Sequence, residues 1–167
     1  MTTQIRMYNQ EDYPELLSFY ERIDSQYFPR LSERPGGLDA HMLKVLNKGG
    51  GFFLYLVGNR IEGASAYNPV DKDKSCVEFT LFSFSESFWN SLAPLRLARY
   101  MIEMKDPLGY AEVEKFIART FYPESSARLE RLGFNKVAEV ENDVIEGRTS
   151  YYYEADAKTV VKKLSRK

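Results

Sequence analysis

Three neighbouring strand patterns in the middle of the chain constrain its fold most. The apolar run Phe52–Val57 is joined to the strand pattern Arg60–Tyr67 by Gly58-Asn59, a dipeptide typical of two-residue hairpin turns. The third pattern, Cys76–Phe84, alternates between apolar and polar residues, as a half-buried strand does. Strands linked by such short turns predict an antiparallel meander, so this part of the chain should form a sheet.

The alternation in the third strand assigns its side chains to two faces. Val77, Phe79 and Leu81 should share one face of the sheet. Glu78 and Thr80 should point to the opposite face. This is the pattern of a strand that is exposed on one side.

A helix and a further strand follow the meander. The segment Leu95–Ile102 carries apolar residues at helical spacing, and Lys115–Phe121 has a strand pattern. Because a strand–helix–strand unit joins parallel strands, Cys76–Phe84 and Lys115–Phe121 should run parallel, with a right-handed crossover. Lys136–Val140 and Arg148–Tyr153 predict a closing antiparallel pair.

The chain before the meander predicts a short strand and two helices. Ile5–Met7 is the strand, and Asp12 has the position of an N-cap for the first helix, with Glu15 three residues later. The second helix spans Leu38–Leu46 and should end at the glycines Gly49–Gly51. The whole chain therefore predicts an α+β fold in one domain, residues 1–167, with a mixed sheet that carries helices on its faces.

Charge and composition exclude several classes of protein. The 23 Lys and Arg residues nearly balance the 24 Asp and Glu residues, for a net charge of −1. Because proteins that bind nucleic acid or anionic membranes usually carry a basic excess, we expect neither partner. With Cys76 and His41 each the only residue of its type, no disulfide and no metal site are expected, and a cytoplasmic location follows. No apolar run approaches the ~20 residues of a membrane span.

The segment Ser126–Phe134 gives the most specific signal. Its Ala127, its leucine spacing and its terminal Leu-Gly-Phe, together with the order of elements, resemble the GNAT family of acyl-CoA-dependent N-acyltransferases. Gly63, after the hairpin, fits the same resemblance. It implies a three-layer α/β/α GNAT-like fold. It also implies transfer of an acyl group, in the first place acetyl from acetyl-CoA, to the amine of a small molecule or peptide.

The cofactor motif of that family, Q/R-x-x-G-x-G/A, should follow the third strand of the meander, where backbone N–H groups approach the diphosphate. Here the segment Ser83–Pro94 contains no glycine and includes Glu86, which would repel a diphosphate. The resemblance then leaves these residues as candidate ligands of the diphosphate: Ser85, Ser87, Asn90, Ser91 and Arg96. Arg96 and its neighbour Arg99 are equally consistent with a solvated helix face.

The resemblance also implies a catalytic base on the third strand. Glu78 lies where the family commonly keeps a glutamate, and a carboxylate can take the proton of an attacking amine. The backbone of Thr80, Leu81 and Phe82 would pair with the pantetheine arm and polarise the thioester carbonyl. One glutamate between apolar neighbours is also what any half-exposed strand contains.

The general acid is less well marked. Leu129 stands where many family members have the tyrosine that returns a proton to the CoA thiolate, and leucine has no proton to give. Tyr122, at the end of the preceding strand, is the substitute candidate, and it is equally a partly buried strand tyrosine. Glu62, just before Gly63, is a second candidate base.

Two functions remain open on this sequence. One is an N-acyltransferase that uses acetyl-CoA. The other is a catalytically degenerate GNAT-like domain that binds a ligand or a protein, which the missing glycines, the missing arginine of the motif and Leu129 favour. The run Tyr151–Tyr153 places rings on both faces of the last strand, so we also expect that a homodimer could form there.

Overall fold

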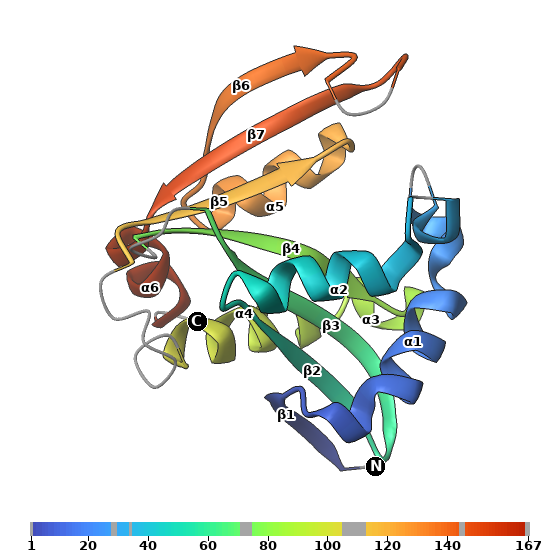
Figure 1. The fold of residues 1–167 in the computed structure, drawn as a ribbon. Coiled ribbons are helices and arrows are strands. Elements are labelled where there is room, and N and C mark those ends of the chain that lie inside the picture. The colour runs from blue at the N-terminus through green and yellow to red at the C-terminus, as the bar shows by residue number, and fades with distance from the viewer. Residues whose placement is uncertain are drawn as a thin grey trace. The chain divides into compact units, whose positions relative to one another are not determined.

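The computed structural model describes residues 2–27, 30–33, 35–70, 75–104, 113–143 and 146–165 (Figure 1). The strands are β1 (Thr3–Met7), β2 (Gly51–Val57), β3 (Arg60–Pro69), β4 (Cys76–Phe84), β5 (Lys115–Thr120), β6 (Asn135–Glu141) and β7 (Thr149–Asp156). The α-helices are α1 (Tyr13–Arg22), α2 (Gly37–Asn47), α3 (Glu86–Trp89), α4 (Ala93–Glu103), α5 (Ser126–Arg131) and α6 (Ala157–Ser165). Short 3-10 helices are η1 (Gln10–Asp12), η2 (Asp24–Gln26), η3 (Leu31–Glu33) and η4 (Pro123–Ser125).

The strands form a mixed sheet in the order β1-β2-β3-β4-β5-β7-β6. β4 runs parallel to β5, with Cys76 opposite Lys115 and Phe79 opposite Ala118. The ladders β1–β2, β2–β3, β5–β7 and β6–β7 are antiparallel. The α+β class, the mixed sheet and the parallel central pair are therefore confirmed.

By its internal contacts the chain divides into two compact units, residues 1–68 with 81–101 and residues 69–80 with 102–167. In the first unit, alternate residues of β2, Phe52, Leu54 and Leu56, lie in one apolar core with residues of α1 and α2. The opposite face of β2 is covered by α4, where the ring of Phe53 meets that of Tyr100 edge to face. The sheet of this unit thus has helices on both faces (Figure 1), as the three-layer prediction requires.

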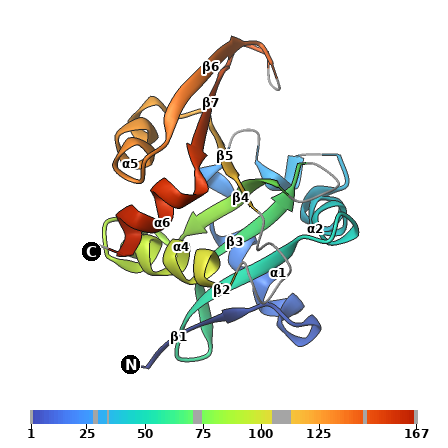
Figure 2. The same ribbon diagram turned by 90° about the vertical axis from the view of Figure 1, so that its left-hand side faces the viewer.

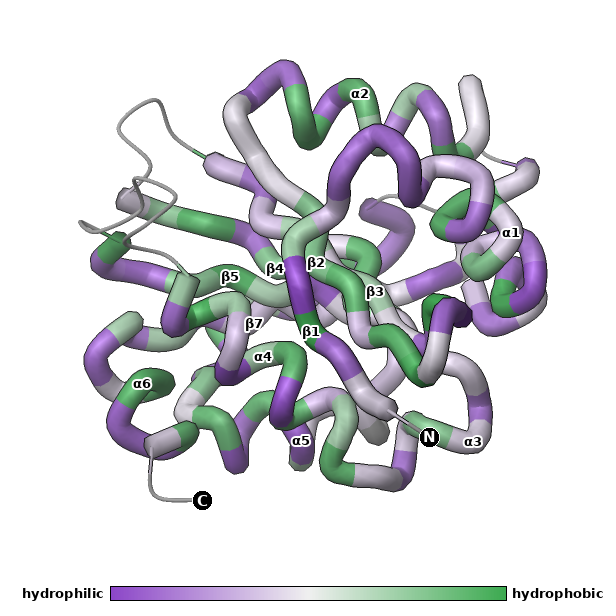
Figure 3. The backbone as a smooth tube through the Cα atoms, turned by 90° about the horizontal axis from the view of Figure 1, so that it is seen from below, coloured by the Kyte–Doolittle hydropathy of each residue, from purple (hydrophilic) through white to green (hydrophobic). Residues whose placement is uncertain are grey.

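The helices of the first unit are amphipathic, as their spacing predicted. Leu16, Phe19 and Tyr20 of α1 are at most 1% exposed, and they occupy positions i, i+3 and i+4, which share one helix face. Along α2, hydrophobic and hydrophilic residues are interspersed (Figure 3). Burial of the apolar stripe, more than helix propensity, stabilises helices of this length.

Gly63 of β3 has a packing reason that the sequence did not reveal. A Cβ atom at this position would lie 2.2 Å from Cε1 of Phe84. The Phe84 ring is fully buried between the rings of Tyr55 and Trp89. Glycine is therefore required at residue 63 because the Phe84 ring lies directly against the β3 backbone.

Asp12 does not have its predicted role as the N-cap of α1. Its backbone is already helical, and its carboxylate closes a capping box on η1 by accepting the Asn9 N–H at 2.8 Å. The same carboxylate forms a two-pronged ion pair with Arg6 of β1, at 2.6 Å for each oxygen. Glu15, the predicted partner of the cap, instead accepts the Ile61 N–H at 3.2 Å. The acidic pair of this turn thus binds the helix to the sheet.

The Arg6–Asp12 pair should make stability depend on acid. The hydrogen bond from Arg6 holds the pKa of Asp12 below its ordinary value, so this contribution is complete above about pH 4 and is lost as the pH falls through the lowered pKa. A double-mutant cycle with Arg6→Met and Asp12→Asn, measured by urea unfolding, should give a coupling energy of about 1 kcal/mol at pH 7 and a smaller one at pH 2. A coupling energy that is the same at both pH values would contradict this assignment.

The second unit explains the Leu-Gly-Phe signal by packing. Phe79 stacks on Phe116 with 4.8 Å between ring centroids, and Phe134 lies against Phe79 at 6.4 Å. Gly133 has a φ of 97°, and a Cβ there would be 3.0 Å from Thr159 of α6. Glycine thus ends α5 beside α6 (Figure 2), and the next residue fills the core of this unit.

β6 is the edge strand of the sheet, and all seven of its residues are exposed. In β7, Tyr153 is buried, and its hydroxyl shares a hydrogen bond with the hydroxyl of Ser126. Tyr151 and Tyr152 are half-buried. The last strand, which we predicted as a dimer surface, is therefore covered along one edge by β6 and along the other by β5. A homodimer stays a prediction.

Candidate functional site

The β4 strand contains a bulge at the residues predicted to polarise a thioester. The Val70 N–H donates to the backbone carbonyl of Cys76, and the Ser85 N–H donates to the backbone carbonyl of Glu62. Between these two bonds, the seven residues 63–69 of β3 lie opposite the eight residues 77–84 of β4. One extra residue in a strand is a β-bulge. Leu81 takes the strain, with a φ of 51° in the left-handed region, where non-glycine residues are rare.

The bulge corrects one prediction about β4. Because alternation shifts by one across the extra residue, Leu81 does not share a face with Val77 and Phe79, as the sequence suggested. Leu81 lies in the core with residues of α1 and α2. Phe82 turns to the other side of the strand and packs against Trp89.

The bulge is supported by two tyrosines of the first unit. Tyr20 of α1 donates its hydroxyl to the Leu81 carbonyl at 3.0 Å, in a fully buried bond. Burial raises the pKa of Tyr20 well above its ordinary value, so the phenol keeps its proton. Tyr27, after η2, shares a hydrogen bond with the hydroxyl of Ser83, a residue 3% exposed. Side chains from outside the sheet therefore hold β4 at the Leu81 carbonyl and at the Ser83 side chain.

The parallel ladder ends before the bulge. β4 and β5 pair from Cys76 to Phe79 of β4, and β4 continues to Phe84. Glu78 is half-buried within the paired part, directly opposite Ile117 of β5. Thr80 is half-buried and lies just beyond it.

The structure does not place Tyr122 in a strand. β5 ends at Thr120, and Tyr122 follows it as the residue before η4, 36% exposed. Its N–H donates to the Thr120 hydroxyl at 3.1 Å. Its alternative role as a partly buried strand tyrosine is therefore wrong, because Tyr122 follows the strand and is exposed.

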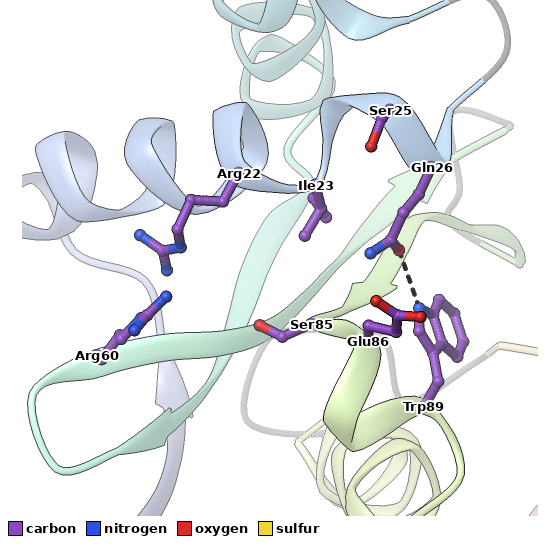
Figure 4. Close-up of a pocket in the computed structure, with 8 residues that line it drawn as sticks. All are labelled: Arg22, Ile23, Ser25, Gln26, Arg60, Ser85, Glu86 and Trp89. Carbon is purple, nitrogen blue, oxygen red and sulfur yellow. Dashed lines mark hydrogen bonds between the residues drawn. The ribbon is translucent and has the colours of Figure 1, made fainter.

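The loop between β4 and α4 is held in place by packed aromatic side chains. A glycine-rich motif in this position would instead leave backbone N–H groups exposed. Trp89 of α3 contacts Phe84 and Phe82, and Phe88 contacts Tyr55. The Trp89 indole N–H also donates to the Gln26 side-chain oxygen at 3.0 Å (Figure 4). These contacts tie α3 to both β2 and η2, so the loop is a packed part of the first unit.

Two of the loop hydroxyls predicted to bind a diphosphate are occupied within the fold. The Ser85 hydroxyl donates to the Glu62 carboxylate, which also pairs with Arg60 at 3.2 Å. The Ser91 hydroxyl donates to the Phe88 carbonyl at 2.8 Å and accepts the Ala93 N–H at 3.0 Å, which caps α4. Glu62, the second candidate base, thus serves as an anchor of the loop.

The remaining candidates lie at the surface. Ser87, Asn90 and Arg96 are all exposed, Ser87 on α3 and Arg96 on the first turns of α4. Pro94 has no N–H, and the Arg96 N–H is bonded to the Leu92 carbonyl. The start of α4 therefore offers an anion fewer backbone donors than a helix N-terminus usually does.

A pocket of about 580 Å³ opens in the first unit, a feature that the sequence did not indicate. It is lined by Arg22, Ile23, Ser25, Gln26, Arg60, Ser85, Glu86 and Trp89 (Figure 4). Arg22 and Arg60 point toward one another, and both are already paired: Arg22 donates to the Ile61 carbonyl at 2.9 Å and lies 3.2 Å from Glu15. Residues from α1, η2, β3 and α3 meet here only in the folded chain, so no local motif could have predicted it.

Two absences hold for the described part of the chain. No group of three or more His, Cys, Asp or Glu side chains there is placed to hold a metal ion. No helix there has the length and apolar character needed to cross a membrane.

Comparison with known proteins gives a clear result for the fold. The sequence matches no family model and no curated protein. The structure resembles a GNAT-family acetyltransferase from Streptococcus pneumoniae (TM-score 0.73, 13% identity, 93% of this chain and 99% of that chain). It also resembles an N-acetyltransferase from Staphylococcus aureus Mu50 (TM-score 0.73, 15% identity, 94% and 99%). A third similar structure is yncA of Salmonella typhimurium, with its cofactor acetyl-CoA (TM-score 0.72, 13% identity, 94% and 95%). The chain has the fold of the GNAT acetyltransferases, and its function has to be argued from its own residues.

Proposed function

We propose that this chain is an N-acyltransferase that moves an acetyl group from acetyl-CoA to the amine of a small molecule or peptide. The observation that carries the proposal is the bulge at Leu81, a strained backbone held by buried contacts. Strain of this kind persists only where the surrounding structure enforces it, and it is concentrated at functional sites. We infer that the bulge turns the Phe82 N–H out of the ladder, as a donor for an oxyanion must be turned.

The described residues fit the thioester arm of acetyl-CoA better than its diphosphate. The described ladder of β4 with β5 runs from Cys76 to Phe79. An extended pantetheine arm would bind the backbone of Leu81 and Phe82 as an added strand. Arg96, with Ser87 and Asn90, would have to hold the diphosphate, since Ser85 and Ser91 are occupied within the fold. Glu86 is exposed in the same loop and opposes an anion.

Each residue of the proposed site has one task. Acetyl-CoA, when bound, supplies an activated thioester whose carbonyl carbon is attacked by the amine. Glu78 takes the proton that the amine nitrogen loses as the new C–N bond forms. The Phe82 N–H binds the carbonyl oxygen as negative charge develops on it. Tyr122 gives its hydroxyl proton to the sulfur as the C–S bond breaks. Protons balance when the phenolate regains, through water, the proton that Glu78 took.

The second candidate function is a binding module without catalysis. It is favoured by the loop after β4, where the sequence lacks the family's glycines and two hydroxyls are already bonded within the fold. In that case the left-handed backbone at Leu81 would be a structural remnant. Binding of acetyl-CoA separates the two functions.

Acetyl-CoA should stabilise the protein against heat. At a hundred times its dissociation constant, a ligand of the folded state adds about 2.7 kcal/mol to the free energy of unfolding. We therefore expect a rise in Tm with acetyl-CoA at millimolar concentration, measured by differential scanning fluorimetry, and a smaller rise for Arg96→Ala at equal concentration. Absence of a rise with acetyl-CoA and with longer acyl-CoAs would exclude the transferase and leave the binding module.

A further inference from the structure

We propose that Tyr20 is a positioning residue for acyl transfer: its hydroxyl fixes the peptide bond between Leu81 and Phe82 so that the Phe82 N–H faces the thioester oxygen. The proposal rests on the proposed function. It goes beyond it by assigning a role to a residue of α1 that does not touch the reacting atoms.

The geometry of one peptide bond carries the first step. The Leu81 carbonyl and the Phe82 N–H belong to the same planar trans peptide, so they point in opposite directions. Tyr20 donates to that carbonyl at 3.0 Å from the core side. The Phe82 N–H is therefore directed away from the Tyr20 phenol, and rotation of this peptide would break a buried hydrogen bond.

The need for such a hold comes from the strain. A non-glycine residue in the left-handed region is strained compared with one in an ordinary strand conformation, because its Cβ atom comes close to the backbone. Without a compensating contact, Leu81 would relax toward the extended conformation and the N–H that follows it would turn back into the ladder. A buried hydrogen bond contributes about as much as this strain, and leaving its carbonyl unpaired costs more.

A second contact confirms that the hold is on this segment of β4. The hydroxyl of Tyr27 bonds that of Ser83, two residues beyond Leu81, and the rings of Tyr20 and Tyr27 are neighbours with 6.4 Å between centroids. Tyr20 thus holds the carbonyl of the peptide bond, and Tyr27 holds the strand one residue beyond Phe82, at the Ser83 side chain. Tyr20 is the more decisive of the two because it bonds the rotating carbonyl itself.

The test removes one oxygen atom. Tyr20→Phe keeps the ring and its packing, and we expect kcat for acetyl transfer to fall at least tenfold while the KM for acetyl-CoA changes less than twofold. The matched control is Tyr153→Phe in the second unit, which also deletes the hydroxyl of a fully buried tyrosine that bonds a side chain. The control should lose a similar amount of thermal stability and keep its kcat within twofold.

A spectroscopic readout separates positioning from a merely structural role. A ketone analogue of acetyl-CoA with ¹³C at the carbonyl should show a downfield resonance when bound to the wild-type protein, because a hydrogen bond polarises the carbonyl. In Tyr20→Phe the analogue should bind with the carbonyl shifted back upfield. If Tyr20→Phe does not fold, Ser83→Ala, which frees the other end of the segment, should give the same upfield change at smaller size.

Each outcome decides one question. Unchanged kcat and an unchanged ¹³C shift in folded Tyr20→Phe would overturn the role of Tyr20 and leave the acyltransferase intact. A wild-type protein that neither binds the analogue nor transfers acetyl to any amine tested would overturn the proposed function itself. An equal loss of kcat in Tyr20→Phe and Tyr153→Phe would show that stability, and not the orientation of one peptide bond, limits activity.

Discussion

Replacing Glu78 with glutamine is expected to lower kcat for acetyl transfer about a hundredfold or more near neutral pH. A positioned general base contributes roughly 10²–10⁴ in rate, and a hundredfold loss corresponds to about 2.7 kcal/mol of barrier. Glutamine keeps the size and the hydrogen-bonding oxygen of the side chain, so binding of acetyl-CoA should be preserved. The measurement is steady-state kinetics with an amine substrate between pH 6 and 10.

The pH dependence identifies the base. As the pH rises above the pKa of the amine, the substrate loses its proton without help, so the deficit of Glu78→Gln should shrink toward pH 10. The matched control is Glu154→Gln on β7, because Glu78 and Glu154 lie directly opposite Ile117 on its two sides. Glu154 pairs with Lys115 at 3.4 Å, and its variant should keep kcat within twofold. A Glu78→Gln protein with full turnover at every pH would remove this residue from the mechanism.

The strand pairing could be predicted because it depends on local patterns of turn residues and apolar residues that are visible in the sequence. The Gly58-Asn59 turn, the apolar run of β2 and the helix between β4 and β5 are local patterns, and the sheet follows from them by rules of connection. The order of elements then resembles only a few known folds. For this reason the GNAT-like fold could be predicted from the sequence, although the three similar structures named above share less than 20% identity with the chain.

The bulge could not be predicted, and the reason is physical. Leu81 is an ordinary strand residue, and nothing in its neighbours marks a left-handed backbone. The residue that supports it, Tyr20, is 61 positions away in sequence. A one-residue shift of alternation is therefore a tertiary property of β4, set by which core side chains and hydrogen bonds lie against it.

The diphosphate loop shows the same limit for polar residues. Serine and asparagine side chains near the start of a helix are chemically suited to bind an anion. A hydroxyl, however, has only one proton to donate, and another acceptor can already hold it. Ser85 gives its proton to Glu62, and Ser91 caps α4. Whether a loop hydroxyl is already hydrogen-bonded depends on a carboxylate of β3 and on the residue at which α4 begins. The sequence of the loop alone reveals neither.

The largest effect on stability is expected at Gly50, between α2 and β2. Gly49 and Gly50 end α2 in a Schellman motif, with the Gly50 N–H on the Val45 carbonyl at 2.9 Å and the Gly49 N–H on the Leu46 carbonyl. A Cβ atom at Gly50 would lie 2.2 Å from the Tyr67 carbonyl oxygen and 2.8 Å from that of Val45. Both are backbone atoms fixed by a strand and a helix, so neither can move aside alone.

Gly50→Ala should therefore lower the free energy of unfolding by about 3 kcal/mol, the upper end of what overpacking usually costs. The adjacent Gly51→Ala is the matched control, because its added Cβ would meet only Met7 Cε at 3.8 Å, an ordinary contact. Gly51→Ala should be neutral or stabilising by up to about 1 kcal/mol, since alanine restricts the unfolded chain. Urea unfolding of both variants measures the difference. Equal stabilities would mean that the α2–β2 junction can rearrange, because a rigid junction has no room for the methyl group at Gly50.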